Sequence, residues 1–181
     1  QINKAGCGCR FVKTDVSDPA QIVRLFEAAK AHCGKLDILV NCAGVCHVTP
    51  LQDAAGGDWG AQIDINLRGT FLCCREALAM MEPNRYGKIV NVTSISGRVG
   101  GIRTSAGYVA SKGGVISLTR SLAKGAAPSN INVNCVAPGV IDTEMTKSHE
   151  YHPGEIPMGR KGTAKEAAEV VAFLSSDRAS Y

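Results

Sequence analysis

Long apolar runs, a strong charge excess and paired metal-binding cysteines are all missing from this sequence. Its apolar runs, such as Ile38–Val40, span only a few residues, whereas a membrane-spanning helix needs about 20. Lys and Arg number 20 against 16 Asp and Glu, and no long block of basic residues occurs. We therefore expect no transmembrane helix and neither nucleic acid nor a membrane as partner.

The eight cysteines form no C-x-x-C pair, so neither a zinc ribbon nor a dithiol motif is indicated. Several lie in apolar stretches, where a free cysteine behaves as a small apolar residue, and we interpret them as reduced thiols of a cytoplasmic protein. Two other groups consist of metal-ligating residue types: Cys42 and Cys46 with His47, and His149 with His152. A strand-to-loop setting disfavours the first and solvated loop histidines explain the second, so we expect no metal.

What the sequence does contain is an alternation of β-branched strands with amphipathic helices. Asp18 before Pro19 and the pair Thr163 and Glu166 are typical of helix starts, and Gly34 is typical of a helix end. Loops are expected at 97–107 and 147–160. The alternation predicts strands at Cys9–Lys13, Leu36–Asn41, Lys88–Thr93 and Ile131–Val136, and helices at Pro19–Cys33, from Trp59 or Gln62 to about Met81, at Tyr108–Lys124 and from Thr163 to Leu174.

This order predicts the α/β class, with a doubly wound parallel sheet covered by helices on both faces, in one domain over residues 1–181. Ligands of such sheets bind beyond the carboxyl ends of the strands. We therefore expect the site to gather the residues that follow each strand: Asp15, Asn41–Gly44, Thr93–Ser96 and Pro138–Thr143.

Tyr108 and Lys112 are four residues apart on a predicted helix and so share one face. An ammonium within about 4 Å of the phenol, at an effective dielectric constant of about 20, contributes about 4 kcal/mol. That would lower the tyrosine pKa from about 10 to about 7, where Tyr108 can exchange protons. Taken alone, the pair is better explained as two unrelated side chains, just as Ser94 alone is a turn serine and Asn66 a helix-end residue.

Together, however, the motifs resemble those of the short-chain dehydrogenases/reductases, of the 3-oxoacyl-(acyl-carrier-protein) reductase-like group, along the whole chain. The matching segments are Asp15-Val16, Asn41-Cys42-Ala43-Gly44 (N-N-A-G with Cys for the second Asn), Asn66, Asn91-Val92-Thr93-Ser94, the Y-x-x-x-K of Tyr108 and Lys112, and the P-G-x-x-x-T of Pro138–Thr143.

This resemblance implies an oxidoreductase that transfers a hydride between NAD or NADP and a secondary alcohol or ketone. Ser94 would orient the substrate oxygen and Tyr108 would exchange a proton with it. Lys112 would lower the pKa of Tyr108 and hold the nicotinamide ribose, and Asn66 would support a water chain. The cofactor-binding residues implied are Asp15, Val16, Asn41, Ala43, Gly44, Tyr108, Lys112, Pro138, Gly139, Val140 and Thr143.

The sequence also departs from the family. No G-x-G-x-x-G run occurs, and the family's first strand, glycine-rich loop, second strand and last strand have no counterpart. We therefore expect a Rossmann-type domain truncated at both ends, lacking the residues that separate NAD from NADP. Such a piece alone is expected neither to hold the family's sheet nor to turn over substrate.

Three functions stay open at this point: a general alcohol dehydrogenase or carbonyl reductase, a 3-oxoacyl-carrier reductase of fatty-acid synthesis, and a non-catalytic dinucleotide-binding protein.

The resemblance also implies a homodimer or homotetramer built on the helices at 62–81 and 108–124, with apolar surface from Phe71, Leu72, Cys73, Leu78, Met80 and Met81. The short 147–160 loop favours a small or slender carbonyl substrate. Arg98 and Arg103 are either exposed loop charges or contacts for an anion. Candidate pocket residues are Cys46, His47, Ile95, Ser96, Arg98, Ile102 and the 147–160 loop.

Overall fold

The computed structural model describes residues 8–53, 56–101, 104–147, 151 and 153–181. Three strands form one parallel sheet in the order β1-β2-β3. Their bounds are β1 Ile38–Asn41, β2 Gly87–Val92 and β3 Ile131–Val136. Asn41 pairs with Asn91 and Asn91 with Cys135, so the three strands end almost level with one another. The strands predicted at 36–41, 88–93 and 131–136 are confirmed to within two residues.

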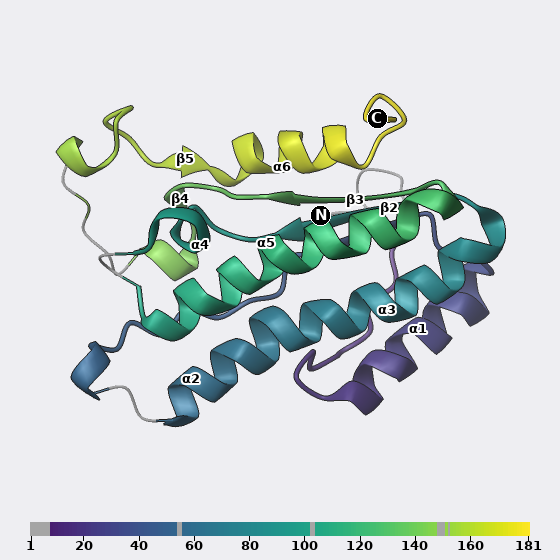
Figure 1. The fold of residues 1–181 in the computed structure, drawn as a ribbon, viewed down its shortest axis with the longest axis horizontal. Helices are drawn as coiled ribbons and strands as arrows, with labels where there is room; N and C mark the ends of the chain where they lie inside the picture. The colour runs from purple at the N-terminus through teal and green to yellow at the C-terminus, as the bar shows by residue number, and fades with distance from the viewer. Residues whose placement is uncertain (1–7, 54–55, 102–103, 148–150, 152) are drawn as a thin grey trace.

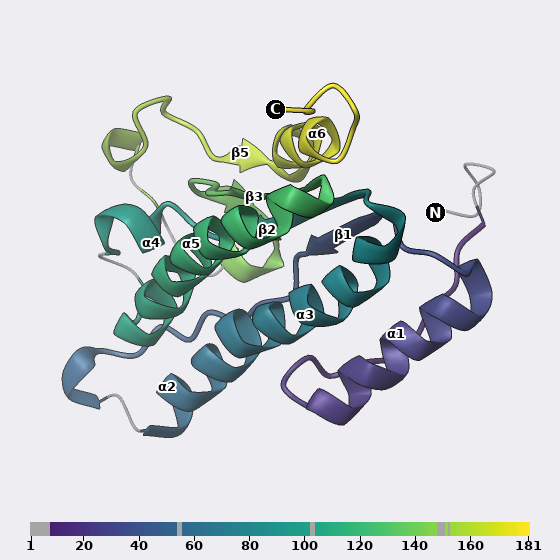
Figure 2. The same ribbon diagram turned by 45° about the vertical axis from the view of Figure 1, so that its right-hand side comes forward.

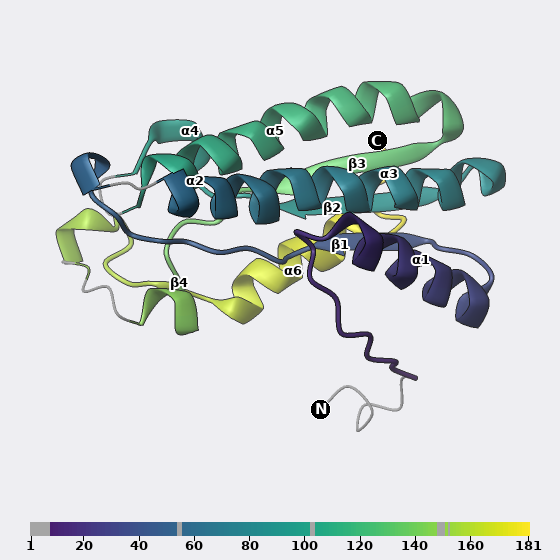
Figure 3. The same ribbon diagram turned by 90° about the horizontal axis from the view of Figure 1, so that it is seen from below.

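Helices cover both faces of this sheet, which confirms the predicted doubly wound α/β architecture (Figures 1 and 3). α3 and α5 cover one face, α1 packs beside α3, and α6 lies on the opposite face. The bounds are α1 Pro19–Cys33, α3 Thr70–Met81, α5 Ala106–Ala126 and α6 Ala164–Leu174. No helix in the described ranges is long and apolar enough to cross a membrane.

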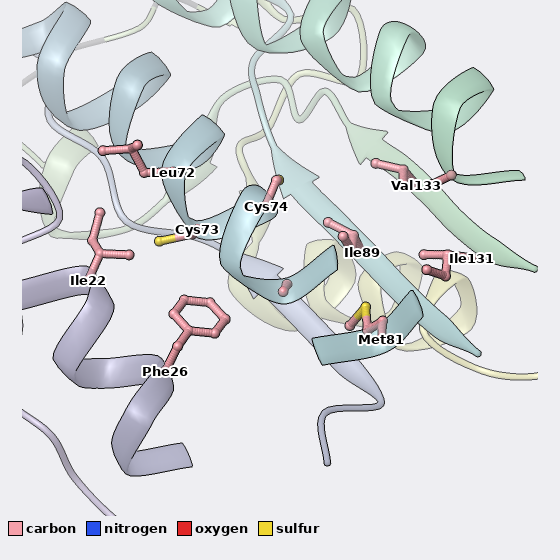
Figure 4. Packing of buried hydrophobic residues seen from close by; sticks show 11 residues of the cluster. Ile22, Phe26, Leu72, Cys73, Cys74, Met81, Ile89, Ile131 and Val133 are labelled. Atoms are coloured by element: carbon pink, nitrogen blue, oxygen red, sulfur yellow. The ribbon is translucent and has the colours of Figure 1, made fainter. Parts of the chain in front are cut away.

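The core lies between α1, α3 and the sheet. Figure 4 shows Ile22 and Phe26 of α1 directed toward α3, and Met81 of α3 beside Ile89 of β2. Ile22, Met81 and Ile89 are completely buried. Because apolar burial is the main favourable term in folding, this cluster anchors the helices that carry the site.

The helix predicted to end near Met81 is continuous from Gly56, but it contains an irregular turn. α2 (Gly56–Gln62) passes into a π-helical segment (Ile63–Gly69), which passes into α3. Gly69 closes the π-helical segment against Val16, because a Cβ there would lie 2.7 Å from the Val16 carbonyl oxygen. The π-helical segment places Asn66 in the middle of the helix rather than at its beginning.

Helix caps follow the sequence signals. Asp18 accepts hydrogen bonds from the Ala20 and Gln21 N–H groups, and Gly34, with φ 73°, ends α1. Thr163 and Glu166 form the predicted capping box of α6. Short elements complete the fold: α4 Ser96–Val99, β4 Ile141–Asp142 and β5 Gly162–Thr163, with 3-10 turns at Leu51–Asp53, Glu82–Asn84, Ala127–Ser129, Glu144–Thr146 and Pro153–Glu155.

Three expectations are wrong. Cys9–Lys13 is not a strand: none of the described strands pairs with it, and Phe11 is 86% exposed, so neither hydrogen bonding nor burial supports one. The 97–107 stretch is not all loop, since its first residues belong to α4. Leu72, Cys73 and Met81 do not form outer apolar surface, because they are part of the core; Phe71 is exposed.

Candidate active site

The site lies where the carboxyl ends of the strands meet α4, β4 and the first turns of α5 (Figures 1 and 2). Ser94 is the second residue after β2, and Tyr108 lies in the first turn of α5. The Ser94 hydroxyl lies near enough to the Tyr108 hydroxyl to act on its pKa through hydrogen bonding. Both residues line one pocket, together with Cys46, Ile95, Ser96, Thr104, Gly139, Val140, Met145, Thr146 and Tyr151.

Burial raises the pKa of Tyr108 above the ordinary value of a phenol, and the hydrogen bond with Ser94 opposes this only in part. The expected lowering by Lys112 is therefore not what the structure shows. Lys112 Nζ lies 5.7 Å from the centroid of the Tyr108 ring and donates a hydrogen bond to the Val92 carbonyl oxygen at 2.9 Å. Spacing along a helix predicted that the two residues are close. It could not predict that burial has a larger effect on the pKa of Tyr108 than any neighbouring group.

Lys112 is itself buried, with 5% of its surface exposed, and burial lowers the pKa of its ammonium group. Its position is fixed from two sides. The Thr93 hydroxyl donates a 2.7 Å hydrogen bond to the Lys112 carbonyl oxygen. Gly97 lies directly on the same peptide, since a Cβ there would be 2.6 Å from the Lys112 carbonyl carbon and 2.7 Å from the Gly113 nitrogen.

Asn66 is buried and its side chain is fully used within the protein. Its Oδ1 accepts a hydrogen bond from the Val45 N–H at 2.8 Å, and its Nδ2 donates to the Val45 carbonyl at 2.9 Å and to Ser111 Oγ at 3.0 Å. Asn66 thus connects the loop after β1 to α5. The Ser111 hydroxyl in turn donates to the Tyr108 carbonyl oxygen at 2.8 Å.

The segment after β1 lies close to these groups. A Cβ at Gly44 would be 3.2 Å from Asn66 Oδ1 and 3.4 Å from Lys112 Nζ, so glycine keeps this approach open. Ala43 is exposed. The Asn41 side chain bonds groups on β2 and α3: its Nδ2 donates to Asn91 Oδ1 at 2.8 Å and to Cys74 Sγ at 3.3 Å.

The segment after β3 borders the pocket from the other side. The Ile95 N–H donates to the Pro138 carbonyl at 2.9 Å, which ties this segment to the residue after Ser94. Gly139 and Val140 line the pocket. Thr143 caps the 3-10 turn at Glu144–Thr146, and its N–H donates to Thr146 Oγ1 at 3.1 Å.

Asp15 and Val16 lie in the turn before α1 and do not line this pocket in the described part of the chain. The Asp15 carboxylate accepts hydrogen bonds from the Ser17 hydroxyl at 2.7 Å and the Ser17 N–H at 2.9 Å, which lower its pKa. Val16 packs against Gly69 and the core.

Of the substrate-pocket candidates, Cys46, Ile95 and Ser96 line the pocket, as does Tyr151 of the 147–160 loop. Arg98 and His47, both described, are not among its lining residues. Between residues 8 and 181, the described positions contain no cluster of three or more His, Cys, Asp or Glu that could bind a metal. Ile102, Arg103, His149 and His152 lie outside the described residues.

Sequence reasoning missed three supporting residues: Gln62, Ser105 and Ser111. Gln62 precedes Asn66 by four residues, and this spacing could have indicated a shared helix face. For Ser105 the available signal was its suitability as a cap for the following helix.

Comparison with known proteins agrees with this geometry. A family model described as Enoyl-(Acyl carrier protein) reductase matches residues 2–181. The 3-oxoacyl-(acyl-carrier-protein) reductase FabG of Thermotoga maritima is 41% identical over 172 residues, which cover 92% of this chain and 70% of that protein. The cis-4-hydroxycyclohexanecarboxylate dehydrogenase of Sinomonas cyclohexanicum is 40% identical over 189 residues, covering 99% of this chain and 74% of the relative.

A solved structure shows the same fold. The crystal structure of gox2181 superposes with a TM-score of 0.89 at 38% sequence identity, over 93% of this chain and 69% of that one. The order of elements, the family match along nearly the whole sequence and these identities lead to one conclusion. The chain belongs to the short-chain dehydrogenase/reductase family, whose members are oxidoreductases that act on CH–OH or keto groups.

Proposed function

We propose that this chain transfers a hydride between NAD or NADP and a secondary alcohol or ketone, with Tyr108 as proton donor and acceptor. The observation that carries the proposal is that Ser94 and Tyr108 line one pocket, with the buried Lys112 ammonium 5.7 Å from the centroid of the Tyr108 ring. A hydroxyl pair can bind the substrate oxygen from two directions, which is what proton transfer to a carbonyl requires.

The residues present fit a dinucleotide. Gly44 leaves open the approach to Lys112 Nζ, and the hydrogen bond to Val92 uses only one of the three N–H donors of an ammonium group. The others can hold ribose hydroxyls. Bound NAD or NADP supplies or accepts the hydride at the nicotinamide C4. Further contacts proposed for it are Asp15, Val16, Asn41, Ala43, Pro138, Gly139, Val140 and Thr143.

In the reducing direction Tyr108 acts as the acid. Because burial raises its pKa, the phenol carries its proton at neutral pH and can donate it to the substrate oxygen while Ser94 orients that oxygen. In the oxidising direction Tyr108 must first lose this proton. The positive charge of Lys112, 5.7 Å from the ring centroid, then stabilises the phenolate, and Asn66 supports the route by which the proton leaves.

A second candidate is reduction of a 3-oxoacyl group carried as a thioester. It is favoured by the several 37–41% identical relatives named as 3-oxoacyl-(acyl-carrier-protein) reductases. The dehydrogenase from Sinomonas, 40% identical, favours a cyclic alcohol instead. Both substrates present a secondary alcohol or ketone to the same residues, so the pocket chemistry is common to both.

The experiment is a substrate and cofactor panel. The full-length protein is mixed with NADH or NADPH and a short 3-oxoacyl thioester, and with NAD or NADP and a cyclic secondary alcohol, while the absorbance of reduced nicotinamide is followed. Turnover with either substrate supports the proposal, and the preferred pair decides between the two candidates. No cofactor-dependent turnover on any pair would contradict it.

We further propose a cytoplasmic homodimer or homotetramer. Phe71 on α3 is 42% exposed, and exposed apolar side chains on long helices favour association of identical subunits. A mass equal to one subunit in light scattering at micromolar concentration would contradict the oligomer.

A further inference from the structure

Both backbone groups of Tyr108 are held by serine hydroxyls. The Tyr108 N–H donates to Ser105 Oγ at 3.2 Å, and the Ser111 hydroxyl donates to the Tyr108 carbonyl at 2.8 Å. Each serine is in turn bonded to a buried amide of the neighbouring helix. Asn66 donates to Ser111 at 3.0 Å, and the Ser105 hydroxyl donates to Gln62 Oε1 at 2.9 Å.

Gln62 and Asn66 also bind the backbone of one loop, residues 45–47, which we call the pocket loop because Cys46 lines the pocket. Asn66 bonds both backbone groups of Val45, whereas Gln62 Oε1 accepts a hydrogen bond from the His47 N–H at 3.2 Å. Cys46, between these two positions, lines the same pocket as Tyr108. The two amides, one helical turn apart, therefore connect the pocket loop to α5 in parallel.

Gln62 is as deeply buried as Asn66, with each 1% exposed. Its Nε2 donates to the Asp58 carbonyl at 3.1 Å, so both ends of the amide are bonded. Gly107 lies against it, because a Cβ there would be 3.0 Å from Gln62 Nε2. A buried amide costs free energy unless it is hydrogen-bonded, so any change that breaks one of these contacts leaves a polar group unpaired and shifts its neighbours.

We propose that Gln62 is a positioning residue for Tyr108: through Ser105 and His47 it sets the distance between the start of α5 and the pocket loop. Gln62 does not line the pocket in the described part of the chain, so it acts through other residues. The inference rests on the proposed role of Tyr108 in proton transfer. Because a misplacement of about 1 Å can cost about a hundredfold in rate, loss of this contact should reduce turnover more than cofactor binding.

The test compares three variants of the full-length protein. Gln62→Met keeps the side-chain length but removes the acceptor for Ser105 and His47. Gln62→Glu keeps an acceptor oxygen. Thr119→Val is the matched control, since Thr119 is buried on the same helix as Tyr108 and its hydroxyl bonds Val115 and Asn91 at 2.7 and 2.9 Å, far along the helix from the pocket.

For Gln62→Met we expect kcat to fall about tenfold, with KM for the cofactor within about twofold. Gln62→Glu, which keeps the acceptor but loses the donor to the Asp58 carbonyl, should recover only part of the loss. Thr119→Val should lower the melting temperature but leave kcat within about twofold. Ser105→Ala combined with Gln62→Met should lose no more than the worse single variant, because both remove one connection. A kcat for Gln62→Met within about twofold of the parent, or an equal loss in Thr119→Val, overturns the inference.

Amide hydrogen exchange provides a readout that does not need turnover. Gln62→Met should speed exchange at the His47 and Tyr108 N–H groups selectively, and Thr119→Val should not. If the parent protein shows no cofactor-dependent turnover, the proposed function fails while this measurement still decides the inference. Unchanged protection at both N–H groups then refutes the connection through Gln62.

Discussion

α5 and α6 begin with the same local device and use it differently. Ser105 caps α5 by accepting the Tyr108 N–H at 3.2 Å, and Thr163 caps α6 by accepting the Glu166 N–H at 3.1 Å. Ser105 is buried and bonded to Gln62, whereas Thr163 and Glu166 are exposed and Glu166 is bonded to Arg160 at the surface. A cap in water stabilises a helix, while a buried cap also fixes where the helix begins.

The two helices differ in the same way along their whole length. α5 contains eight buried residues, among them Tyr108 and Lys112. None of the residues of α6, all of which are described, is buried. The site's chemistry is therefore placed on the helix whose position is determined by many buried contacts, which suits groups that must be held to a fraction of an ångström. Changes in the first two turns of α5, around Tyr108 and Lys112, should alter rate, and comparable changes near α6 should alter only stability.

The largest expected effect is that of Tyr108→Phe. It removes only the hydroxyl, so turnover should fall by at least about a thousandfold, as losses of a general acid do. Cofactor affinity, measured by fluorescence titration, should stay within about threefold, because the ring and its packing remain. Turnover within about tenfold of the parent would show that Tyr108 is not the proton donor.

Lys112→Ala should reduce both turnover and cofactor affinity, because Lys112 is proposed to serve Tyr108 and the ribose together. Its ammonium is buried and bonded to Val92, so the cavity left behind also lowers stability by about 2–5 kcal/mol. Lys112→Met fills most of that cavity and should bind cofactor as weakly as Lys112→Ala. Unchanged cofactor affinity in the methionine variant would contradict the double role.

Gly97→Ala should lower both stability and kcat more than a glycine substitution near the surface does, because Gly97 packs against α5. Its new methyl group would lie 2.6 Å from the Lys112 carbonyl carbon, so the peptide that carries Lys112 must move. We expect a loss of about 1–3 kcal/mol in the free energy of unfolding and a lower kcat. Gly125→Ala, on α5 with open space around it, should instead be neutral or stabilising by up to about 1 kcal/mol. Equal effects of the two would refute the close approach at Gly97.

Glu166→Gln should have the smallest effect and only on stability. Hydrogen bonds with Arg160 and Thr163 lower the Glu166 pKa to about 2. Because the folded-state pKa lies below the unfolded one, the stabilising contribution is fully present above an ordinary carboxyl pKa of about 4.3. It is lost as the pH falls toward about 2. The difference in melting temperature between parent and variant should therefore shrink between pH 5 and pH 2, with kcat unchanged at neutral pH; a constant difference would contradict the assigned pKa.

Much of the fold could be predicted because it depends on local signals. β-branched runs marked β1, β2 and β3, and the residues Asp18, Gly34 and Thr163 marked helix ends. The segment Cys9–Lys13 could not be predicted, because a strand exists only beside a hydrogen-bonding neighbour. β4 and β5, two residues each, are also set by their mutual pairing rather than by a pattern.

For the candidate site, convergence at the strand ends predicted that Ser94 and the segment after β3 would meet, and both line one pocket; Asp15, predicted there too, does not line it. The pKa of Tyr108 was predicted in the wrong direction because burial depends on every element around it. Gln62 escaped notice for the same reason. The role of a helical glutamine depends on its tertiary partners, and the sequence alone does not show that His47 and Ser105 bind Gln62.

The π-helical segment Ile63–Gly69 makes the length of this helix as important as its composition. An α-helix rotates by about 100° per residue, and a π turn accommodates one residue more than a regular turn. Before it, Gln62 faces the pocket loop; after it, Leu72 and Cys73 face the core. Deleting one residue here would leave a regular helix whose two ends could no longer both face their partners, so this stretch should tolerate no deletion.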